Sequence, residues 1–478
     1  MNTDSKDFKP VGKFPAWLKK GQIEALEKMI EFTYRDDRHV FALEGAAGTG
    51  KTTIIKELRH HVKSTSGFIV AAPTHKAVRV ISNATGLEGI TVHKLMGFRP
   101  NFNIDNFDPN RIQFDAFGKK HIENYNTIAI DEASMLPRKL VKYITDEAIK
   151  HNVKIIFMGD AYQLPPVGET TSTAFIQPKD SKYCLKEIVR QGDDNPLSPL
   201  LADIRTAIDR RNFNYINNIV GRRSLKNGKG YLHADIDAFQ AYASRAFTND
   251  SFKKNIDWCK FVTYTNENVA VWNKFIRQQI LTEANRPMIV HDLFTCYNTI
   301  VDEFNDSKII NSEDYIVNDY HEYTNKDGIK GWAVQFQEVS TGRITPYLFV
   351  VDHSDINNFA TVTFIINKLI SDASSIANSP SARSKKWEAF YKFRGENLLM
   401  IDIRDPDTGK IIIGKDLDYG YALTSHKAQG STYNHVFVNL QNMLYGNGNS
   451  HIVQSAEMIN RLFYVGASRA KETLTVLF

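Results

Sequence analysis

The chain is 478 residues long and 42% hydrophobic, enough to bury more than one core, and its three cysteines have no Cys-x-x-Cys spacing, which excludes a disulfide scaffold. Neither the polar N-terminus, residues 1–9, nor any later stretch has the apolar run of a signal peptide or a membrane span, so we expect a cytoplasmic protein without a membrane partner. The 59 basic and 54 acidic residues give a net charge of only +5, which excludes a polycation and requires any DNA-binding surface to be a local groove.

The first predicted elements surround a phosphate-binding loop. Residues 39–43 have the composition of a buried strand, and residues 53–58 begin an amphipathic helix. The sequence between them fits the pattern G-x-x-x-x-G-K-[ST], in which backbone N–H groups surround the phosphates, the lysine reaches the β- and γ-oxygens, and the last hydroxyl ligates Mg²⁺. The predicted ATP and Mg²⁺ site comprises Gly45, Ala46, Ala47, Gly48, Thr49, Gly50, Lys51, Thr52 and Thr53.

Further apolar runs predict two parallel sheets. One set lies at 68–72, 127–130 and 154–158, and a second set lies at 261–265, 435–438 and 473–477. Their nearly continuous apolar character is typical of parallel strands that are covered on both faces. Because ligands of such sheets bind beyond the carboxyl ends of the strands, we expect an α/β fold whose two sheets form the two walls of a nucleotide cleft.

Two of these strand ends carry candidate catalytic groups. Beside a phosphate loop, Asp131 can hold Mg²⁺ and Glu132 can orient or deprotonate the attacking water. An Asp-Glu pair is also a common helix cap and first-turn pair, but the upstream loop favours catalysis. Gln163 can detect a γ-phosphate through neutral hydrogen bonds, although its stretch by itself is more typical of an ordinary turn stiffened by proline.

Between residues 284 and 415 the pattern changes to alternating strands. Residues 333–339 and 347–351 alternate around a Thr341-Gly342 turn, which predicts a small β-rich insertion. Its polar part, from Ser371 to Arg394, is expected to be partly helical, with a break at residues 379–381.

In their order along the chain, these segments resemble the motifs of the superfamily 1 helicases, and among these the RecD/Dda branch. The resemblance rests on the phosphate loop and on residues 72–77 (motif Ia), 91–95 (Ib), 131–134 (II), 159–167 (III), 185–191, 425–432 (V) and 461–470 (VI). It implies two RecA-like P-loop domains, 1A at 1–84 and 116–192 and 2A at 193–283 and 416–478. It also implies an insertion at 85–115 that carries a duplex-splitting pin, and identifies the β-rich stretch 284–415 with an SH3-like insertion.

The resemblance also implies roles for single residues. Gln22 is placed like the family's adenine-reading glutamine, Gly430 joins the nucleotide-binding set, and Arg190 and Arg469 are placed like the arginines that reach the γ-phosphate. A cation from the second domain has a physical purpose there, because negative charge spreads over the γ-oxygens during hydrolysis. The implied DNA-binding residues are Pro73, Thr74, His75, His93, Lys94, Phe98, Thr265, Thr424, His426 and Lys427.

Base contacts by aromatic side chains are a weaker expectation. Phe98 is the candidate for an apolar wedge against the end base pair, and Phe102, Tyr264 and Trp272 are candidates for stacking on bases. The chain has 29 phenylalanines, however, and most of them must lie in the core.

These features predict an ATP- and Mg²⁺-dependent helicase that moves along single-stranded DNA and opens forked duplexes, with the 5′ to 3′ polarity of the branch. We expect a monomer, in the host cytoplasm if the gene is viral, working with replication or recombination proteins such as a single-strand-binding protein. Two alternatives stay open: an RNA-directed member of the superfamily, and a nucleotide-gated clamp that holds single strands without productive turnover. Glu132 argues against the clamp, because a catalytic base has no purpose in one.

Overall fold

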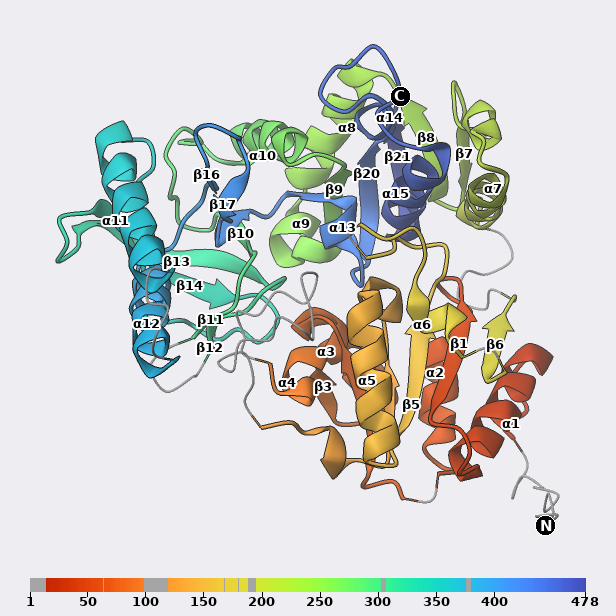
Figure 1. Ribbon diagram of the computed structural model, residues 1–478. Coiled ribbons are helices and arrows are strands. Elements are labelled where there is room, and N and C mark those ends of the chain that lie inside the picture. The colour runs from red at the N-terminus through yellow and green to blue at the C-terminus, as the bar shows by residue number, and fades with distance from the viewer. Residues whose placement is uncertain are drawn as a thin grey trace. The chain divides into compact units, whose positions relative to one another are not determined.

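The computed structural model describes residues 14–62, 64–98, 119–166, 168–178, 180–187, 195–301, 307–374 and 380–478, without the side chains of 380–386 (Figure 1). The chain forms two compact units, one from Met1–Val269 and Leu423–Phe478 and the other from Ala270–Ala422. Among the described residues, no helix has an apolar stretch long enough to cross a membrane.

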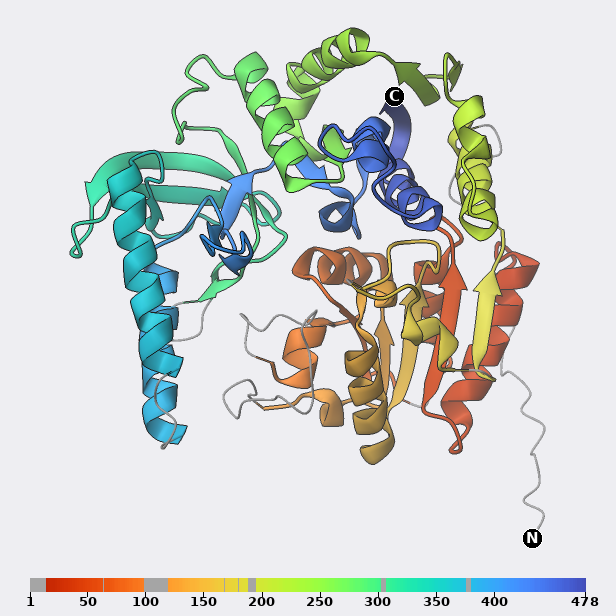
Figure 2. The same cartoon turned by 45° about the horizontal axis from the view of Figure 1, so that its top comes forward.

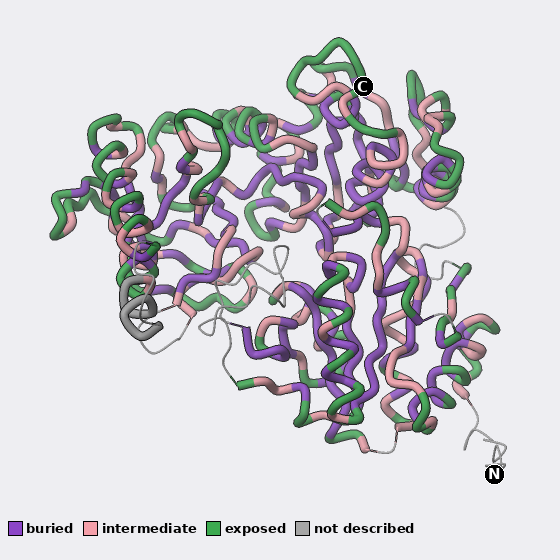
Figure 3. Tube along the Cα trace, in the orientation of Figure 1, coloured by how far each residue is buried: buried purple, intermediate pink, exposed green. Residues whose placement is uncertain are grey.

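The first sheet of the larger unit has six strands, all parallel, in the order β3-β2-β4-β5-β1-β6. The strands are β1 (Val40–Gly45), β2 (Phe68–Ala72), β3 (Gly89–Thr91), β4 (Thr127–Ile130), β5 (Lys154–Gly159) and β6 (Lys182–Leu185). The helices are α1 (Lys20–Tyr34), α2 (Lys51–Leu58), α3 (His75–Thr85), α4 (Val92–Met96), α5 (Arg138–Lys150) and α6 (Thr173–Ile176), with 3₁₀ turns η3 (Ile122–Asn124) and η4 (Ala133–Met135). Every residue of β2, β4 and β5 is buried, as expected for strands covered on both faces (Figure 3).

The second sheet of this unit also has six strands, in the order β19-β9-β20-β21-β8-β7. The strands are β7 (Arg223–Lys226), β8 (Lys229–Ala234), β9 (Cys259–Thr263), β19 (Ala422–Thr424), β20 (Tyr433–Asn439) and β21 (Ala470–Leu477). The helices are α7 (Leu197–Arg210), α8 (Ile236–Phe247), α9 (Asp250–Lys254), α13 (Ser425–Ala428), α14 (Leu440–Tyr445) and α15 (Ala456–Ser468), with η5 (Asn214–Asn218) and η6 (Ile256–Trp258). β9, β20, β21 and β8 are parallel, and β7 pairs antiparallel with β8. The predicted α/β fold with two parallel sheets is confirmed.

The smaller unit is built on an antiparallel sheet in the order β15-β14-β13-β10-β18. Its strands are β10 (Leu293–Cys296), β13 (Asp314–Thr324), β14 (Lys330–Glu338), β15 (Leu348–Val351) and β18 (Leu417–Tyr419), with the pairs β11 (Ile300–Val301) and β12 (Ser307–Ile309), and β16 (Ile403–Arg404) and β17 (Ile411–Ile413). Helix α10 (Asn266–Ile280) contains the boundary between the units. The β-rich character of this stretch matches the alternation in the sequence.

Two long helices complete the smaller unit. α11 (Ile356–Ser374) and α12 (Pro380–Glu396) lie side by side (Figure 2). They share a core cluster that includes Val362, Ile366 and Phe390. α12 begins at Pro380, where a missing N–H is tolerated, and this agrees with the predicted break in the helical stretch. The SH3-like assignment of the insertion stays a prediction.

The predicted pin insertion is described only in part. β3 and α4, inside the predicted range 85–115, belong to the first sheet and its core, while residues 99–118 lie outside the described residues. The pin and the domain boundaries therefore stay predictions.

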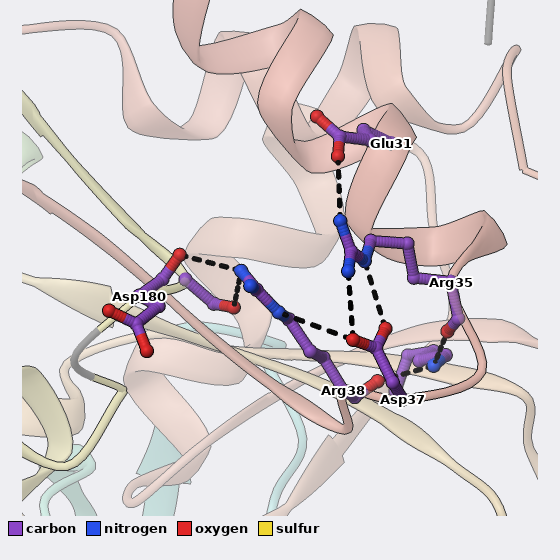
Figure 4. A network of polar contacts seen from close by, with 7 residues as sticks. Glu31, Arg35, Asp37, Arg38 and Asp180 are labelled. Atoms are coloured by element: carbon purple, nitrogen blue, oxygen red, sulfur yellow. Dashed lines mark hydrogen bonds and ion pairs between the residues drawn. The ribbon is translucent and has the colours of Figure 1, made fainter. Parts of the chain in front are cut away.

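A polar network fastens α1 to the first sheet (Figure 4). Arg35 forms two hydrogen bonds of 2.8 Å to the Asp37 carboxylate and one of 3.2 Å to Glu31. The bond from Arg35 lowers the pKa of Asp37 to about 2. The buried Lys154 ammonium donates to the carbonyls of Arg35 and Arg38, so the end of α1 is fixed to the start of β5. This anchoring holds the helix that carries Gln22.

Candidate active site

The phosphate loop joins β1 to α2 and has the backbone of an anion-binding nest. Gly48 and Gly50 both have φ of +86°, which is costly for any other residue. A Cβ at Gly45 would lie 2.5 Å from Thr49 Oγ1, so that glycine is required by space. Lys51 Nζ donates to the carbonyl oxygens of Gly45, at 2.6 Å, and Ala46, at 3.2 Å. A bound phosphate would compete with these carbonyls for the ammonium.

Gln22 is packed against this loop. Its Nε2 donates to the Thr49 carbonyl at 3.1 Å, and its Oε1 accepts the Lys19 N–H at 3.0 Å. A Cβ at Gly50 would lie 2.2 Å from Gln22 Nε2, so the amide covers the glycine closely. The side chain is only 4% exposed. Gln22 therefore ties the start of α1 to the phosphate loop, whatever it contributes to the recognition of adenine.

Asp131 and Glu132 follow β4 directly. Asp131 N–H continues the strand ladder by donating to the Ala71 carbonyl at 2.8 Å. Glu132 then turns into the left-handed region, with φ of +51°, before the 3₁₀ turn η4. Such a conformation costs a non-glycine residue about 1–3 kcal/mol and is typical of functional sites. Gly159 faces the turn, because a Cβ there would lie 3.5 Å from the amide nitrogens of Ala133 and Ser134.

The two carboxylates lie in a desolvated environment although part of each residue is accessible. Burial raises the pKa of Asp131. Burial and the nearby charge of Asp131 raise the pKa of Glu132 to about 7, while the charges of Arg469 and Lys51 act in the opposite direction. Glu132 Oε2 and Gln163 Oε1 are buried and accept no hydrogen bond from the described residues. Such acceptors fit a ligand that brings donors, as a hydrated Mg²⁺-nucleotide does.

Groups from the second sheet's domain meet these carboxylates. A Cβ at Gly430 would lie 3.6 Å from Ala77 Cβ and 3.8 Å from Glu132 Cγ and Oε1, so the turn that contains Gly430 lies against both. Arg469, at the end of α15, is 4% exposed and donates to the carbonyls of Val465 and Ser431 and to the Ser468 hydroxyl. Its charge is close enough to lower the pKa of Glu132. Arg190 lies outside the described residues.

The loop after β5 is held by the same domain. Asp160 is 1% exposed and accepts a 2.7 Å hydrogen bond from Tyr464 Oη. Arg461 Nη1 donates to the carbonyls of Ala161, at 2.6 Å, and Gln163, at 2.9 Å. The sequence prediction did not include Arg461 and Tyr464 in the site. The sequence did offer one indication: Arg461 and Tyr464 are three residues apart, and residues at this spacing on a helix lie on the same face.

A family model described as an AAA domain matches residues 17–216, which contain the phosphate loop and the strand ends of the first sheet. The ATP-dependent DNA helicase Dda of Enterobacteria phage T4 is 29% identical over 58% of this chain and 60% of its own length. The ATP-dependent RecD2 DNA helicase of Deinococcus radiodurans is 28% identical over 32% of this chain and 20% of its own length. These matches make the chain similar to ATP-dependent DNA helicases of the RecD, Dda and Pif1 group.

Likeness over the whole length is weaker. The motifs predicted a particular likeness to the Dda helicase of T-even bacteriophages, and the alignment with the T4 protein covers less than two thirds of it. An uncharacterized protein of Acanthamoeba polyphaga mimivirus is 24% identical over 95% of this chain and 98% of its own length. The crystal structure of Pif1 helicase from Candida albicans is 19% identical, with a TM-score of 0.49 over 96% of this chain and 94% of its own length.

Three predicted DNA-contacting segments are helices that begin at or just after the end of a strand. Thr74 caps α3 by accepting the Ala77 N–H, and Thr424 caps α13 by accepting the Lys427 N–H. Thr91 caps α4 in the same way. Helix N-termini of this kind suit phosphate groups, and the caps leave the first N–H groups of each helix in position to donate.

The predicted DNA-binding side chains around these helices differ in exposure. His75 and Lys94 are exposed, Thr74, His93, His426 and Lys427 are partly exposed, and Pro73 and Thr424 are buried. Burial lowers the pKa of His426, so at neutral pH this imidazole offers a hydrogen bond but no charge to a phosphate.

Two aromatic predictions are wrong because the side chains are core residues. Phe98 is 5% exposed, and its ring lies 6.3 Å from the His93 ring and 6.4 Å from the Tyr143 ring, so it is not an exposed wedge. Trp272 is 4% exposed and packs edge-on against Phe275. Phe102 lies outside the described residues.

Two further predicted contacts are engaged within the protein. Tyr264 is partly exposed, and its hydroxyl accepts a 3.1 Å hydrogen bond from Gln454. Thr265 Oγ1 accepts the Asn268 N–H at the start of α10 and donates to Asn447 at 2.7 Å. The Thr265 hydroxyl therefore reaches DNA only if it leaves these partners.

Proposed function

We propose that the protein is an ATP- and Mg²⁺-dependent DNA helicase that moves 5′ to 3′ along single-stranded DNA and opens forked duplexes. The observation that carries the proposal is the position of Glu132. This carboxylate of the first sheet lies within electrostatic reach of Lys51 from its own domain and Arg469 from the other, and it contacts the Gly430 turn. A triphosphate in this pocket would touch both domains.

The chain's own groups suit the steps of ATP hydrolysis. Lys51 would exchange its two loop carbonyls for phosphate oxygens. Thr52 and Asp131 would hold Mg²⁺, which when bound neutralises charge on the β- and γ-phosphates. Glu132, with a pKa of about 7, can accept a proton from the attacking water near neutral pH.

Two side chains would complete the polar surroundings of the reacting phosphate. Gln163 Oε1, which has no hydrogen-bond partner among the described residues, can accept a hydrogen bond from the same attacking water. Arg469, from the second sheet's domain, would add positive charge where the charge of the transition state develops. Arg190 is proposed for the same purpose from its place in the sequence.

For the protein to move along DNA, ATP binding and hydrolysis must change the contacts that hold the DNA. The Gly430 turn lies close to Glu132 and to Ala77, which is on the helix capped by Thr74, so a change at the bound nucleotide would be passed to a helix proposed to hold DNA. ATP would favour the closed arrangement of the two sheet domains, and loss of phosphate would remove the ligand that holds them together. The two domains would then hold and release a single strand alternately.

The test is unwinding of forked duplexes that carry only a 5′ tail or only a 3′ tail, with ATP and Mg²⁺ present. We expect strand separation from the 5′ tail and little from the 3′ tail. The reverse preference would contradict the polarity, and no separation from either substrate would contradict the helicase.

A parallel measurement separates DNA from RNA. ATP hydrolysis is measured with single-stranded DNA and with RNA of the same sequence. Stronger stimulation by DNA is expected, and a clear preference for RNA would make the protein an RNA-directed member of the superfamily. Size measurement in solution, alone and with a single-strand-binding protein, addresses the proposed monomer and partner.

A further inference from the structure

Helix α7 lies outside every motif identified in the sequence, yet it touches the loop after β5. Its apolar face, which includes Leu200, Leu201 and Ile204, is buried in the core of the second sheet's domain with Leu462 and Phe463 of α15. Its polar side carries Arg205 and Asp209, four residues apart and therefore neighbours on the helix surface.

Arg205 acts on this loop through Tyr464. Arg205 Nη1 lies 3.5 Å from Tyr464 Oη, and the guanidinium lies 5.8 Å from the centre of the Tyr464 ring. Tyr464 is fully buried and donates its hydroxyl proton to Asp160 Oδ2 at 2.7 Å. Tyr464 Oη becomes more negative when its proton is donated to Asp160, and the positive charge of Arg205 stabilises the oxygen in that state. Arg205 thus favours the orientation of Tyr464 in which Asp160 is held.

Asp209 acts on the same loop through Tyr162. Tyr162 Oη donates to Asp209 Oδ2 at 3.0 Å, and Tyr162 N–H donates to Asp160 Oδ1 at 3.0 Å. Burial and the hydrogen bond to Asp209 raise the pKa of Tyr162 to about 12, which keeps the phenol protonated and donating. Asp160 and Tyr162 are therefore each joined to α7, one through Tyr464 and one directly.

Gln163 is the next residue in this loop. Its N–H donates to the Asp160 carbonyl at 3.1 Å, which closes the turn. Gln163 is 5% exposed, and within the part of the chain that the structure describes its Oε1 has no hydrogen-bond partner. A shift of Asp160 or Tyr162 would move the Gln163 carboxamide with them, because the three residues form one tight turn. Small errors in the position of a group near reacting atoms are costly for the rate.

We propose that Arg205 and Asp209 of α7 are positioning residues that hold Gln163 for ATP hydrolysis through Tyr464 and Tyr162. This inference rests on the proposed function. It adds two side chains of α7 to a catalytic pocket whose predicted members all come from the sequence motifs.

The test compares two alanine variants on one helix. Asp209→Ala removes the acceptor of the Tyr162 bond. Asp203→Ala, the control, removes an exposed carboxylate of α7 that accepts a 3.1 Å hydrogen bond from Asn218 Nδ2 instead. Tyr162→Phe removes the same bond as Asp209→Ala from the other side, and Arg205→Met removes the charge but keeps a long stem.

Four quantities are measured for each variant: the DNA-stimulated kcat of ATP hydrolysis, KM for ATP, ATP consumed per base pair opened, and Tm. We expect Asp209→Ala, Tyr162→Phe and Arg205→Met to lower kcat about three- to tenfold and to raise the ATP consumed per base pair, with KM within about twofold of wild type. Their Tm should match that of Asp203→Ala. The double variant Tyr162→Phe/Asp209→Ala should be no slower than the slower single variant.

A kcat for Asp209→Ala equal to that of Asp203→Ala would overturn the inference, and so would multiplicative losses in the double variant. A loss of kcat that is accompanied by a matching loss of Tm would assign α7 a purely structural role. Failure of the wild-type protein to hydrolyse ATP with DNA would contradict the proposed function instead, so the two failures are distinguishable.

Discussion

The two six-stranded sheets of the larger unit contribute to the pocket in different ways. The first presents its groups from strand ends: the phosphate loop after β1, the carboxylates after β4 and Gln163 after β5. The second presents Gly430 and Arg469 from the turn after α13 and from the end of α15. The phosphate loop and the carboxylates follow strands of the first sheet directly. The loop that carries Gln163 is also held by Arg461 and Tyr464 of the second sheet's domain, and Gly430 and Arg469 reach the pocket only through the packing of one domain on the other. On the proposed function, the first sheet would bind phosphate, and the second would decide whether bound ATP reacts.

The strongest test of this division is Lys51→Ala. Removal of the ammonium should abolish both ATP binding and DNA unwinding, with a loss of hydrolysis of about a thousandfold, because the phosphates lose their main charged partner. Filter binding of ATP and steady-state hydrolysis measure the two effects. Lys56→Ala, on the exposed side of the same helix, is the matched control and should behave as wild type. Unwinding retained by Lys51→Ala would be fatal to the assignment of the loop.

Glu132→Gln separates binding from chemistry within the first sheet. The amide keeps the shape of the side chain but cannot take the proton of the attacking water, so ATP should still bind while turnover falls by about 10²- to 10⁴-fold. Equilibrium binding and single-turnover hydrolysis are the measurements. Normal hydrolysis in this variant would contradict the assignment of Glu132 as the catalytic base. It would also remove the argument against a nucleotide-gated clamp.

Arg469→Gln tests the second sheet's contribution. We expect kcat to fall about a hundredfold with little change in KM, because the charge is needed chiefly as the γ-phosphate reacts. Arg469 also braces the end of α15 through three hydrogen bonds, so Tm is measured, and Arg469→Lys keeps the charge as a second variant. A rise in KM with unchanged kcat would make this arginine a binding group that takes no part in the chemical step.

Gln22→Ala tests what holds the loop to α1. If Gln22 acts by bracing the phosphate loop, KM should rise about three- to tenfold for ATP and for GTP alike, since the bonds to Thr49 and Lys19 are lost whichever base is bound. If it reads adenine, only the preference for ATP over GTP should shrink. Steady-state kinetics with both nucleotides decides between the two results.

The smallest expected effect concerns His435 at the second sheet. Burial lowers its pKa, against the opposing charge of Glu472, so the unfolded chain binds a proton more readily than the folded one. The free energy of unfolding should therefore fall as the pH drops below about 6.5, the ordinary histidine pKa, and Tm with it by a few degrees. His435→Gln should flatten this slope slightly, whereas His451→Gln, at an exposed histidine, should leave it unchanged.

The sequence predicted those parts of the pocket whose spacing is local. The loop glycines, the carboxylates after β4 and the alternation of the smaller unit's strands all follow from short patterns. Phe98 was misassigned because its burial depends on Tyr143, which is distant in the sequence. The hydrogen bonds from Arg461 to the loop after β5 were not predicted, because their acceptors are backbone carbonyls. Every residue has such a carbonyl, so the sequence does not indicate which ones accept a bond.

The left-handed backbone at Glu132 has a consequence for how the protein can change. A glycine at this position would adopt the same φ without penalty and would be expected to make the folded chain slightly more robust. It would also remove the carboxylate that the pocket is arranged around. With Glu132 as the proposed catalytic base, selection for thermal stability and selection for turnover would oppose each other at this residue, and variants chosen only for heat resistance would lose hydrolysis.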